Sequence, residues 1–487
     1  MFVSLELWRG MRRHGLGFAA TWGYTQDNWL FSLIPLSALG YEALGPRASV
    51  ALGFGWAVFV ACVGMTGWLT ARLAGWRAGL VLASVLAFAN VNAAGASGYL
   101  TYPLSHNGSM AWALGALILS LLALGRRSYA AAAAAGLAVL ANTLSDPWAG
   151  VAIAGPLAAT AGALALVHRG RPEGRVALTL AGVTIAAAAL AQTRIFGLLS
   201  FLPASHFRFA DLPHMAGNAY WGWRVTGAMF NIAPGLGPED RLARWLSAPA
   251  FLALLAFAVA VGINRLRNAP IERQLVFGTS VLSIAGMAGI YLVGRWDWQL
   301  AIGRFFPNLY FLGGLLIACA VADRWSAWGR WPKRCVAAYA ALFVVAGLAS
   351  APALWLRGPA PPARSSALAD FLQAKGLDYG YGVFWGTRAL GMDVRTGGKV
   401  TIRPVSLGNG RVERRWTQNS TLWYTAADEP ASRRRFLALR NDGEECVPIG
   451  ACVEVAVRQF GPPSEAYVFR DFVILVWPRS IAAKIAS

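Results

Sequence analysis

The chain has 487 residues, of which 56% are hydrophobic and only 14% are charged. This composition excludes an ordinary soluble protein and indicates a polytopic membrane protein. The formal net charge is +20, but no nucleic-acid-binding motif accompanies it. We therefore attribute part of this charge to membrane topology and expect no nucleic-acid partner.

Residues 1–48 are expected to form an N-terminal extracytoplasmic or interfacial segment. Residues 1–18 carry Arg9, Arg12 and Arg13 and have no apolar stretch typical of a signal peptide. The apolar run 29–45 is marginal in length for a span. Either this run crosses the membrane and the N-terminus is cytoplasmic, or the start is truncated and an upstream helix is missing. The second alternative is favoured, with the run lying along the membrane interface.

Residues 49–357 are expected to form a transmembrane helical domain, because ten apolar runs have about the length that a helix needs to cross the hydrocarbon core. The runs are 49–71, 77–97, 109–125, 129–145, 148–167, 177–200, 247–264, 275–293, 306–322 and 335–356. With the marginal run, the predicted fold class is an α-helical polytopic membrane protein of about 10–11 transmembrane helices.

The basic residues between the runs predict the orientation, because Lys and Arg stay on the cytoplasmic side. If the first good span runs from outside to inside, the cytoplasmic connections carry Arg72, Arg77, Arg126, Arg127, Arg169, Arg171, Arg175, Arg265, Arg267, Arg273, Arg324, Arg330, Lys333 and Arg334. The opposite connections carry half as many: Arg47, Arg208, Arg224, Arg241, Arg244, Arg295 and Arg304. The connection 201–246 and everything after Leu356 are therefore expected outside the cytoplasm.

Residues 358–487 change character and predict a soluble extracytoplasmic α+β domain. A Pro-rich linker, RGPAPPARSS, is followed by LADFLQAKG, which is typical of a short helix. KVTIRPV, CVEVAVRQF and AYVFRDFVILVW are typical of strands. The spacing of Cys446 and Cys452 predicts a disulfide in an oxidising compartment. Two thiols without a nearby His argue against zinc, and no motif assigns a cofactor, so a divalent metal is left open.

Asp146, in NTLSDPWAG, is the one acid at a membrane boundary between Ala48 and Ala210, since Glu173 falls in a cytoplasmic turn. Asp followed by Pro147 is a common helix start, so Asp146 is interpreted either as an N-cap or as a group that faces a substrate or ion.

Other polar side chains gather on the predicted outer side, accompanied by aromatic residues. Arg pairs bidentately with phosphate and aromatic rings favour headgroup depth, so these residues predict a site for a lipid-linked phosphate. For any one of them, interfacial anchoring or a loop salt bridge is the alternative. The candidate substrate-binding residues, together with Asp146, are His106, Arg194 inside a predicted span, His206, Arg208, Arg224, Arg295 and Arg304.

Several short motifs resemble those of the GT-C superfamily of integral-membrane glycosyltransferases. DNWLFSLIPLSALGYEALGPRA is similar to the family's segment after the first outer loop, with Pro35, Leu44-Gly45 and Arg47 at its marker positions. GRFFPNLYFL is similar to the Arg-Tyr-x-x-Pro element that opens a late span, here Arg304, Phe305 and Pro307. GYGVFWGTRALGM resembles an element of C-terminal domains in uncharacterised bacterial proteins of this type. The subfamily is left open.

This resemblance implies a protein of the bacterial inner membrane that transfers a sugar from a polyprenyl-phosphate carrier to an envelope acceptor, with membrane lipid as a further partner. It also implies a catalytic carboxylate in the first outer loop, for which Asp27 is the nearest candidate as a general base. The alternative for Asp27 is the N-cap of a helix over 28–44. Arg194, Arg208, Arg224 and Arg304 are the candidates to hold the leaving phosphate.

Two functions of other classes remain open. A non-catalytic scaffold would use the soluble domain to bind an envelope partner. A transporter of a lipid-linked substrate would usually show paired halves, and no clear internal repeat is present.

Overall fold

A computed structural model describes residues 2–88, 99–102, 104–203, 207–234, 240–296, 300–355, 364–408, 410–425, 434–440, 446 and 448–486. The chain divides into two compact units. The helical unit comprises 26–35 and 52–356. The α/β unit comprises 1–25, 36–51 and 357–487, so it is assembled from segments at both ends of the sequence.

The helical unit confirms the predicted fold class, because each of the ten apolar runs overlaps a helix within the described residues. The helices are α3 (Ala48–Ala74, entering this unit at Leu52), α4 (Trp76–Ala87), α5 (His106–Arg126), α6 (Tyr129–Ser145), α7 (Gly155–Val167) after the π-helical turn η3 (Gly150–Ala154), α8 (Pro172–Gln192), α9 (Leu212–Met229), α10 (Arg241–Leu266), α11 (Ile271–Val293), α12 (Pro307–Arg324) and α13 (Arg330–Trp355). Within the described residues, seven helices are long and apolar enough to cross a membrane; α4, α6, α9 and α12 are not among them.

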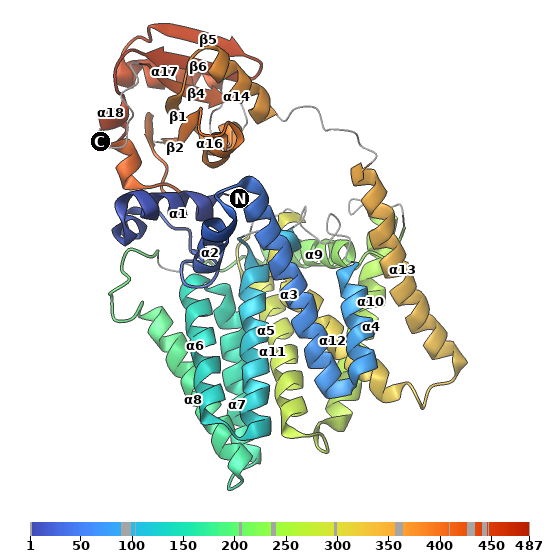
Figure 1. Ribbon diagram of the computed structural model, residues 1–487. Coiled ribbons are helices and arrows are strands. Elements are labelled where there is room, and N and C mark those ends of the chain that lie inside the picture. The colour runs from blue at the N-terminus through green and yellow to red at the C-terminus, as the bar shows by residue number, and fades with distance from the viewer. Residues whose placement is uncertain are drawn as a thin grey trace. The chain divides into compact units, whose positions relative to one another are not determined.

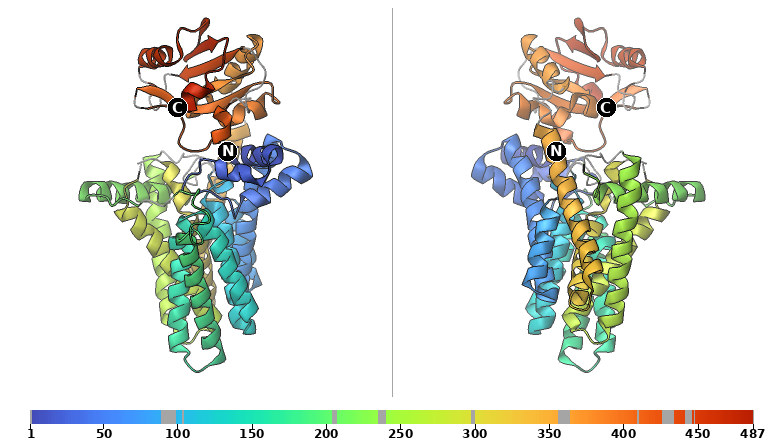
Figure 2. Two further views of the ribbon diagram at one scale, coloured as in Figure 1. Left: turned by 90° about the vertical axis from the view of Figure 1, so that its left-hand side faces the viewer. Right: turned by 90° about the vertical axis from the view of Figure 1, so that its right-hand side faces the viewer.

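The bundle helices alternate in direction, so their connections collect at two ends (Figure 1). One end holds the starts of α5, α10 and α12 and the ends of α6, α8 and α11. Helix α9 lies across this end instead of along the bundle, as both views in Figure 2 show. We call it the α9 end. The short 3-10 helices η2 (Tyr99–Thr101) and η4 (Leu300–Phe305) contact each other in this unit.

The run 177–200 predicted that Arg194 lies inside a span, and this prediction is wrong. Helix α8 ends at Gln192, and residues 193–201 form turns. Arg194, Ile195 and Phe196 have φ values of 48°, 47° and 55°, which do not continue a helix. The apolar sequence after Arg194 resembles a helix by composition alone, whereas the polar pair Gln192-Thr193 marks the real end.

The α/β unit contains a six-stranded sheet with strand order β3-β2-β1-β4-β6-β5. The strands are β1 (Tyr379–Val383), β2 (Thr401–Gly408), β3 (Arg411–Arg414), β4 (Arg435–Arg440), β5 (Glu465–Phe469) and β6 (Phe472–Trp477). Strand β1 is central and pairs in parallel with β2 and β4, while the outer pairs are antiparallel. This mixed sheet confirms the α+β prediction for the C-terminal region.

Helices cover both faces of this sheet. Side chains alternate between faces along a strand, and one face packs Ile402, Phe436 and Ile474 against α14 (Arg364–Ala374). The opposite face carries Trp477, whose ring lies 5.5 Å from that of Phe460 in α17 (Ile449–Phe460). The result is a three-layer arrangement around a buried sheet.

The predicted strand CVEVAVRQF is wrong, because these residues belong to helix α17. Its buried residues are Cys452, Ala456 and Phe460, spaced four apart as on one face of a helix. The alternating Val residues had indicated a strand. The structure joins Cys452 to Cys446 in a disulfide, with the Cα atoms 5.9 Å apart.

N-terminal residues complete the α/β unit. Helix α1 (Val3–His14) contributes Phe2 and Leu5 to a buried cluster with Tyr41 of α2 (Ile34–Leu44) and Ala51. The segment after α1 pairs with the C-terminal region, since Gly23 N donates to Asn419 O at 2.7 Å. The rings of Trp22 and Trp423 meet edge-on with centroids 5.1 Å apart.

Gly380 provides a test of the packing around β1. A Cβ atom at this position would lie 2.4 Å from the carbonyl oxygen of Phe436. Gly380→Ala should therefore force β1 and β4 apart and lower the free energy of unfolding of the α/β unit by about 1–3 kcal/mol. Gly450→Ala is the matched control, because no atom lies within 4 Å of its added Cβ. Thermal unfolding of both variants in detergent checks this, and equal midpoints would contradict the described register.

Candidate functional site

Three segments singled out in the sequence meet at the α9 end of the helical unit. His106 is the first residue of α5, Asp146 follows the last residue of α6, and Phe305 closes η4. His106 Nδ1 lies 2.6 Å from Asp146 Oδ2, and the two side chains are only 3% and 1% exposed. The structure thus joins two of the predicted substrate-binding residues, 40 positions apart, in one buried pair.

Asp146 accepts three hydrogen bonds. Its Oδ2 atom also accepts from Ser109 Oγ at 2.5 Å, and its Oδ1 atom accepts from the backbone N–H of Trp148 at 3.0 Å. The Oδ1 atom of Asp146 therefore caps the following turn, as one interpretation predicted. The Oδ2 atom contacts His106 and Ser109 instead. A buried carboxylate needs such donors, since removal from water is costly.

Aromatic rings flank His106. The ring of Phe305 lies 4.7 Å and that of Trp148 5.6 Å from the imidazole, centroid to centroid. Trp148 Nε1 donates to the carbonyl of Phe305 at 2.8 Å, which ties η4 to the turn after α6. His106 Nε2 is buried and has no hydrogen-bond partner within the described part of the chain. The surrounding rings therefore hold the His106–Asp146 pair in place, while the Nε2 atom of His106 is not used in a described hydrogen bond.

The segment after Asp27 is attached beside this pair. The backbone N–H groups of Asn28 and Trp29 donate to the carbonyl of Ser145 at 2.8 and 3.0 Å. The Asn28 side chain donates to the carbonyl of Leu144 at 2.9 Å. Half-buried Asp27 lies in the bend just before this attachment. Helix α2 begins only at Ile34, so the predicted role of Asp27 as N-cap of a helix over 28–44 is wrong.

The remaining predicted residues fall in several places. Arg304 belongs to η4 and is exposed, with its guanidinium 5.0 Å from the ring of Phe305. Arg208 and Arg295 are joined through the backbone, because Arg295 N donates to Arg208 O at 2.9 Å. Arg224 lies in α9, and Arg194 in the turn after α8. His206 lies outside the described residues.

Sequence reasoning missed Ser109, Trp148, Asn28 and Ser145. Ser109 could have been found, because residues three apart on a helix share a face and His106 opens the same helix. The other three act through backbone groups or ring packing, which leave no signal in a single sequence. Among the described residues, no three His, Cys, Asp or Glu side chains are grouped so that they could hold a metal ion.

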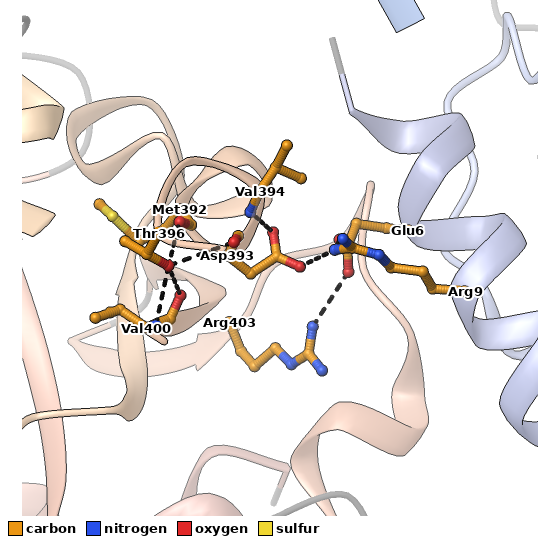
Figure 3. Close-up of polar contacts among 8 residues, drawn as sticks. All are labelled: Glu6, Arg9, Met392, Asp393, Val394, Thr396, Val400 and Arg403. Atoms are coloured by element: carbon orange, nitrogen blue, oxygen red, sulfur yellow. Dashed lines mark hydrogen bonds and ion pairs between the residues drawn. The ribbon is translucent and has the colours of Figure 1, made fainter. Parts of the chain in front are cut away.

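A second charged cluster lies in the α/β unit (Figure 3). Glu6 of α1 contacts Arg9 at 3.1 Å and Arg403 of β2 at 3.4 Å, and Arg9 also pairs with Asp393. Burial and the neighbouring Asp393 carboxylate raise the pKa of Glu6 to about 8, against the opposing effect of the two arginines. This cluster attaches α1 to residues almost 400 positions later, with 397 positions between Glu6 and Arg403.

The pKa of Glu6 has a direct effect on stability. The unfolded chain ionises at its usual pKa of 4.5, whereas folded Glu6 keeps its proton up to about pH 8. The free energy of unfolding of the α/β unit should therefore fall as pH rises from about 4.5 to 8. Glu6→Gln should flatten this decrease, measured by thermal unfolding across that range. Glu42→Gln, at an exposed position of the same unit, should keep the slope of the unchanged protein.

No protein-family model matches the chain, and no curated protein matches it. Solved structures do match. ArnT from Cupriavidus metallidurans in the apo state superposes with a TM-score of 0.52 at 14% identity, covering 99% of this chain and 93% of that one. ArnT bound to undecaprenyl phosphate gives 0.50 at 13% identity, covering 99% and 96%. The Archaeoglobus fulgidus oligosaccharyltransferase gives 0.45 at 13% identity, covering 88% and 60%, a likeness too weak to carry an argument.

The helical bundle with its C-terminal α+β region therefore defines a polytopic membrane protein that shares the fold of ArnT. An identity of 14% establishes the shared fold alone.

Asp146 tests how far the buried pair depends on its acceptor. Asp146→Ala leaves the imidazole, the Ser109 hydroxyl and the Trp148 N–H without their acceptor, and each buried orphan costs about 1–3 kcal/mol. Ser109→Ala removes one donor and should cost only about 0.5–1.5 kcal/mol. The melting temperatures of the purified variants in detergent should fall in that order. A wild-type melting temperature for Asp146→Ala would show that the pair does not stabilise the helical unit.

Proposed function

We propose that this protein transfers a sugar from a polyprenyl-phosphate carrier to an envelope acceptor, on the extracytoplasmic side of a bacterial inner membrane. The observation that carries the proposal is the likeness to ArnT over 99% of this chain. ArnT has been solved with undecaprenyl phosphate bound, and we extend that class of lipid to the present chain.

The composition of the α9 end supports this assignment. Segments at this end carry the carboxylates of Asp27 and Asp146, the imidazole of His106 and the guanidinium of Arg304. The connections at this end are also those with fewer basic residues, which supports an extracytoplasmic location under the positive-inside rule.

The proposed reaction is a displacement at the anomeric carbon of the sugar. The bond between that carbon and the phosphate oxygen breaks, and a bond to the acceptor oxygen forms. The acceptor hydroxyl gives its proton to a general base, and the polyprenyl phosphate leaves with the electron pair. The protein must therefore supply a base and a cation for the developing phosphate charge.

The geometry supports the following division of these roles among the residues. Asp146 already accepts three hydrogen bonds, so it suits positioning His106 better than accepting another proton. Asp27 is partly exposed and lies beside the attached segment, so we assign it as the base. Arg304 is exposed, and its guanidinium lies over the ring of Phe305. We assign it to bind the leaving phosphate, because Arg can bind phosphate bidentately.

The test uses full-length protein in lipid nanodiscs with a panel of polyprenyl-phosphate sugars and a sugar-acceptor extract of the host envelope. Release of polyprenyl phosphate and labelling of the acceptor are measured together. Asp27→Asn should slow both by about 10²- to 10⁴-fold, the usual contribution of a general base. Asp211→Asn is the matched control, because Asp211 caps α9 at the same end and should leave the rate unchanged.

Arg304 is tested separately in the same assay. Arg304→Ala should abolish transfer while the melting temperature stays near that of the unchanged protein, because the side chain is exposed. Arg304→Lys should retain part of the rate, since it keeps the charge but loses the bidentate contact. Equal rates for all three proteins would remove Arg304 from the site.

The other two functional classes predict different results. If the lipid-linked sugar crosses the bilayer intact and no acceptor is labelled, the protein is a transporter. If no lipid is consumed and the host tolerates loss of both Asp27 and Arg304, the protein is a scaffold. Either result would overturn the proposed transfer.

A further inference from the structure

A cavity of about 560 Å³ lies between α9 and the first turn of α10 in the helical unit. Its lining combines three arginines with three aromatic residues: Tyr220, Trp223, Arg224, Arg241, Arg244 and Trp245. We propose that this cavity binds the phosphate of an anionic glycerophospholipid headgroup. The inference does not depend on the proposed sugar transfer.

Arg244 is the residue that most requires a ligand. Its side chain is 9% exposed, and its Nη1 atom is buried without a hydrogen-bond acceptor in the part of the chain that the structure describes. The adjacent Asp240 is occupied in capping α10, since its Oδ1 atom accepts from Leu242 N at 2.8 Å and Ala243 N at 3.3 Å. A buried guanidinium without an acceptor is costly, and phosphate oxygens would satisfy it.

The backbone holds Arg244 at the cavity. A Cβ atom on Gly227 of α9 would lie 2.9 Å from the Arg244 Cα atom, so α9 and α10 approach closely at this point. Arg224 is placed by a different contact, with its guanidinium 4.1 Å from the ring centroid of Trp221. Arg241 is exposed in the same turn of α10 as Arg244. Three cations from two helices therefore converge on one space.

The surroundings indicate a lipid as the source of the phosphate. Helix α10 is a candidate membrane span that begins at Arg241, so its first turn falls at headgroup depth. Tyr220 and Trp245 of the lining are exposed by 57% and 58%, and Leu242 and Leu246 in the first two turns of α10 by 60% and 52%. Exposed Trp and Tyr next to Arg are typical of the membrane interface, where anionic lipids attract basic residues.

The cavity is also built from elements other than those of the candidate transfer site. Its lining comes from α9 and α10, whereas His106, Asp146 and Arg304 come from α5, the turn after α6, and η4. A volume of about 560 Å³ exceeds a single phosphate and lies in the range of small-molecule sites. We therefore assign it to a bulk phospholipid and not to the polyprenyl donor.

The experiment measures lipid binding to full-length protein in detergent by native mass spectrometry. Phosphatidylglycerol, phosphatidylcholine, undecaprenyl phosphate and inorganic phosphate are titrated in parallel. Phosphatidylglycerol should bind in preference to phosphatidylcholine and inorganic phosphate, and undecaprenyl phosphate should not displace it. Arg244→Met should weaken phosphatidylglycerol binding roughly 5- to 10-fold, as expected for one basic residue near a membrane surface.

Matched variants keep the test decisive. Arg241→Gln changes an exposed residue and should weaken binding without loss of fold, so misfolding of Arg244→Met would not hide the result. Arg267→Gln, at the opposite end of α10 and exposed, should bind as the unchanged protein does. Unchanged binding by both cavity variants would overturn the proposal. Equal binding of inorganic phosphate, or displacement by undecaprenyl phosphate, would overturn the assignment to a phospholipid.

Discussion

The buried contact between His106 and Asp146 is the interaction on which the architecture of the α9 end depends. A carboxylate at 1% exposure is tolerated only where donors surround it, and here they come from α5 and from the turn after α6. The neighbouring residues then become acceptors for the N-terminal segment, with Asn28 reaching Leu144 across 116 positions. Through Trp148 and Phe305 the same contact fixes η4 and places Arg304. One polar pair thus sets the positions of four chain segments.

The α/β unit also contains acidic side chains that are removed from water and paired with donors. Glu6, Asp393, Arg9 and Arg403 form a partly buried group in which two acids share two arginines. Their charges do not cancel the cost of burial, as the raised pKa of Glu6 shows. The stabilisation of this unit must therefore come from the apolar packing around β1, β4 and β6 and from the aromatic contacts of the N-terminal segment, with the charged group specifying where α1 attaches.

Features that depend on residues close together in the sequence could be predicted, whereas contacts between residues far apart in the sequence could not. The apolar runs identify the bundle because the bilayer requires long apolar helices, and strands β2, β5 and β6 follow from their alternating or β-branched segments. Arg194, α2 and α17 were misplaced because composition and short alternation do not locate a helix boundary. The outer-side location of His106 and Asp146 was expected from topology, but their contact was not, since nothing in one sequence links positions 106 and 146. Ser109, on the same helix face as His106, and the backbone N–H of Trp148 also donate to Asp146.

The α/β unit is discontinuous in sequence, because residues 1–25 and 36–51 belong with residues 357–487. During synthesis the amino-terminal helices leave the ribosome long before the strands that receive them. Domains usually fold in the order of their synthesis, but this one must leave α1 unassembled until β2 appears. Closing so long a loop is slow, although its entropic cost grows only with the logarithm of length. Synthesis of the last residues, and not of the first, therefore sets the time at which the α/β unit can be complete.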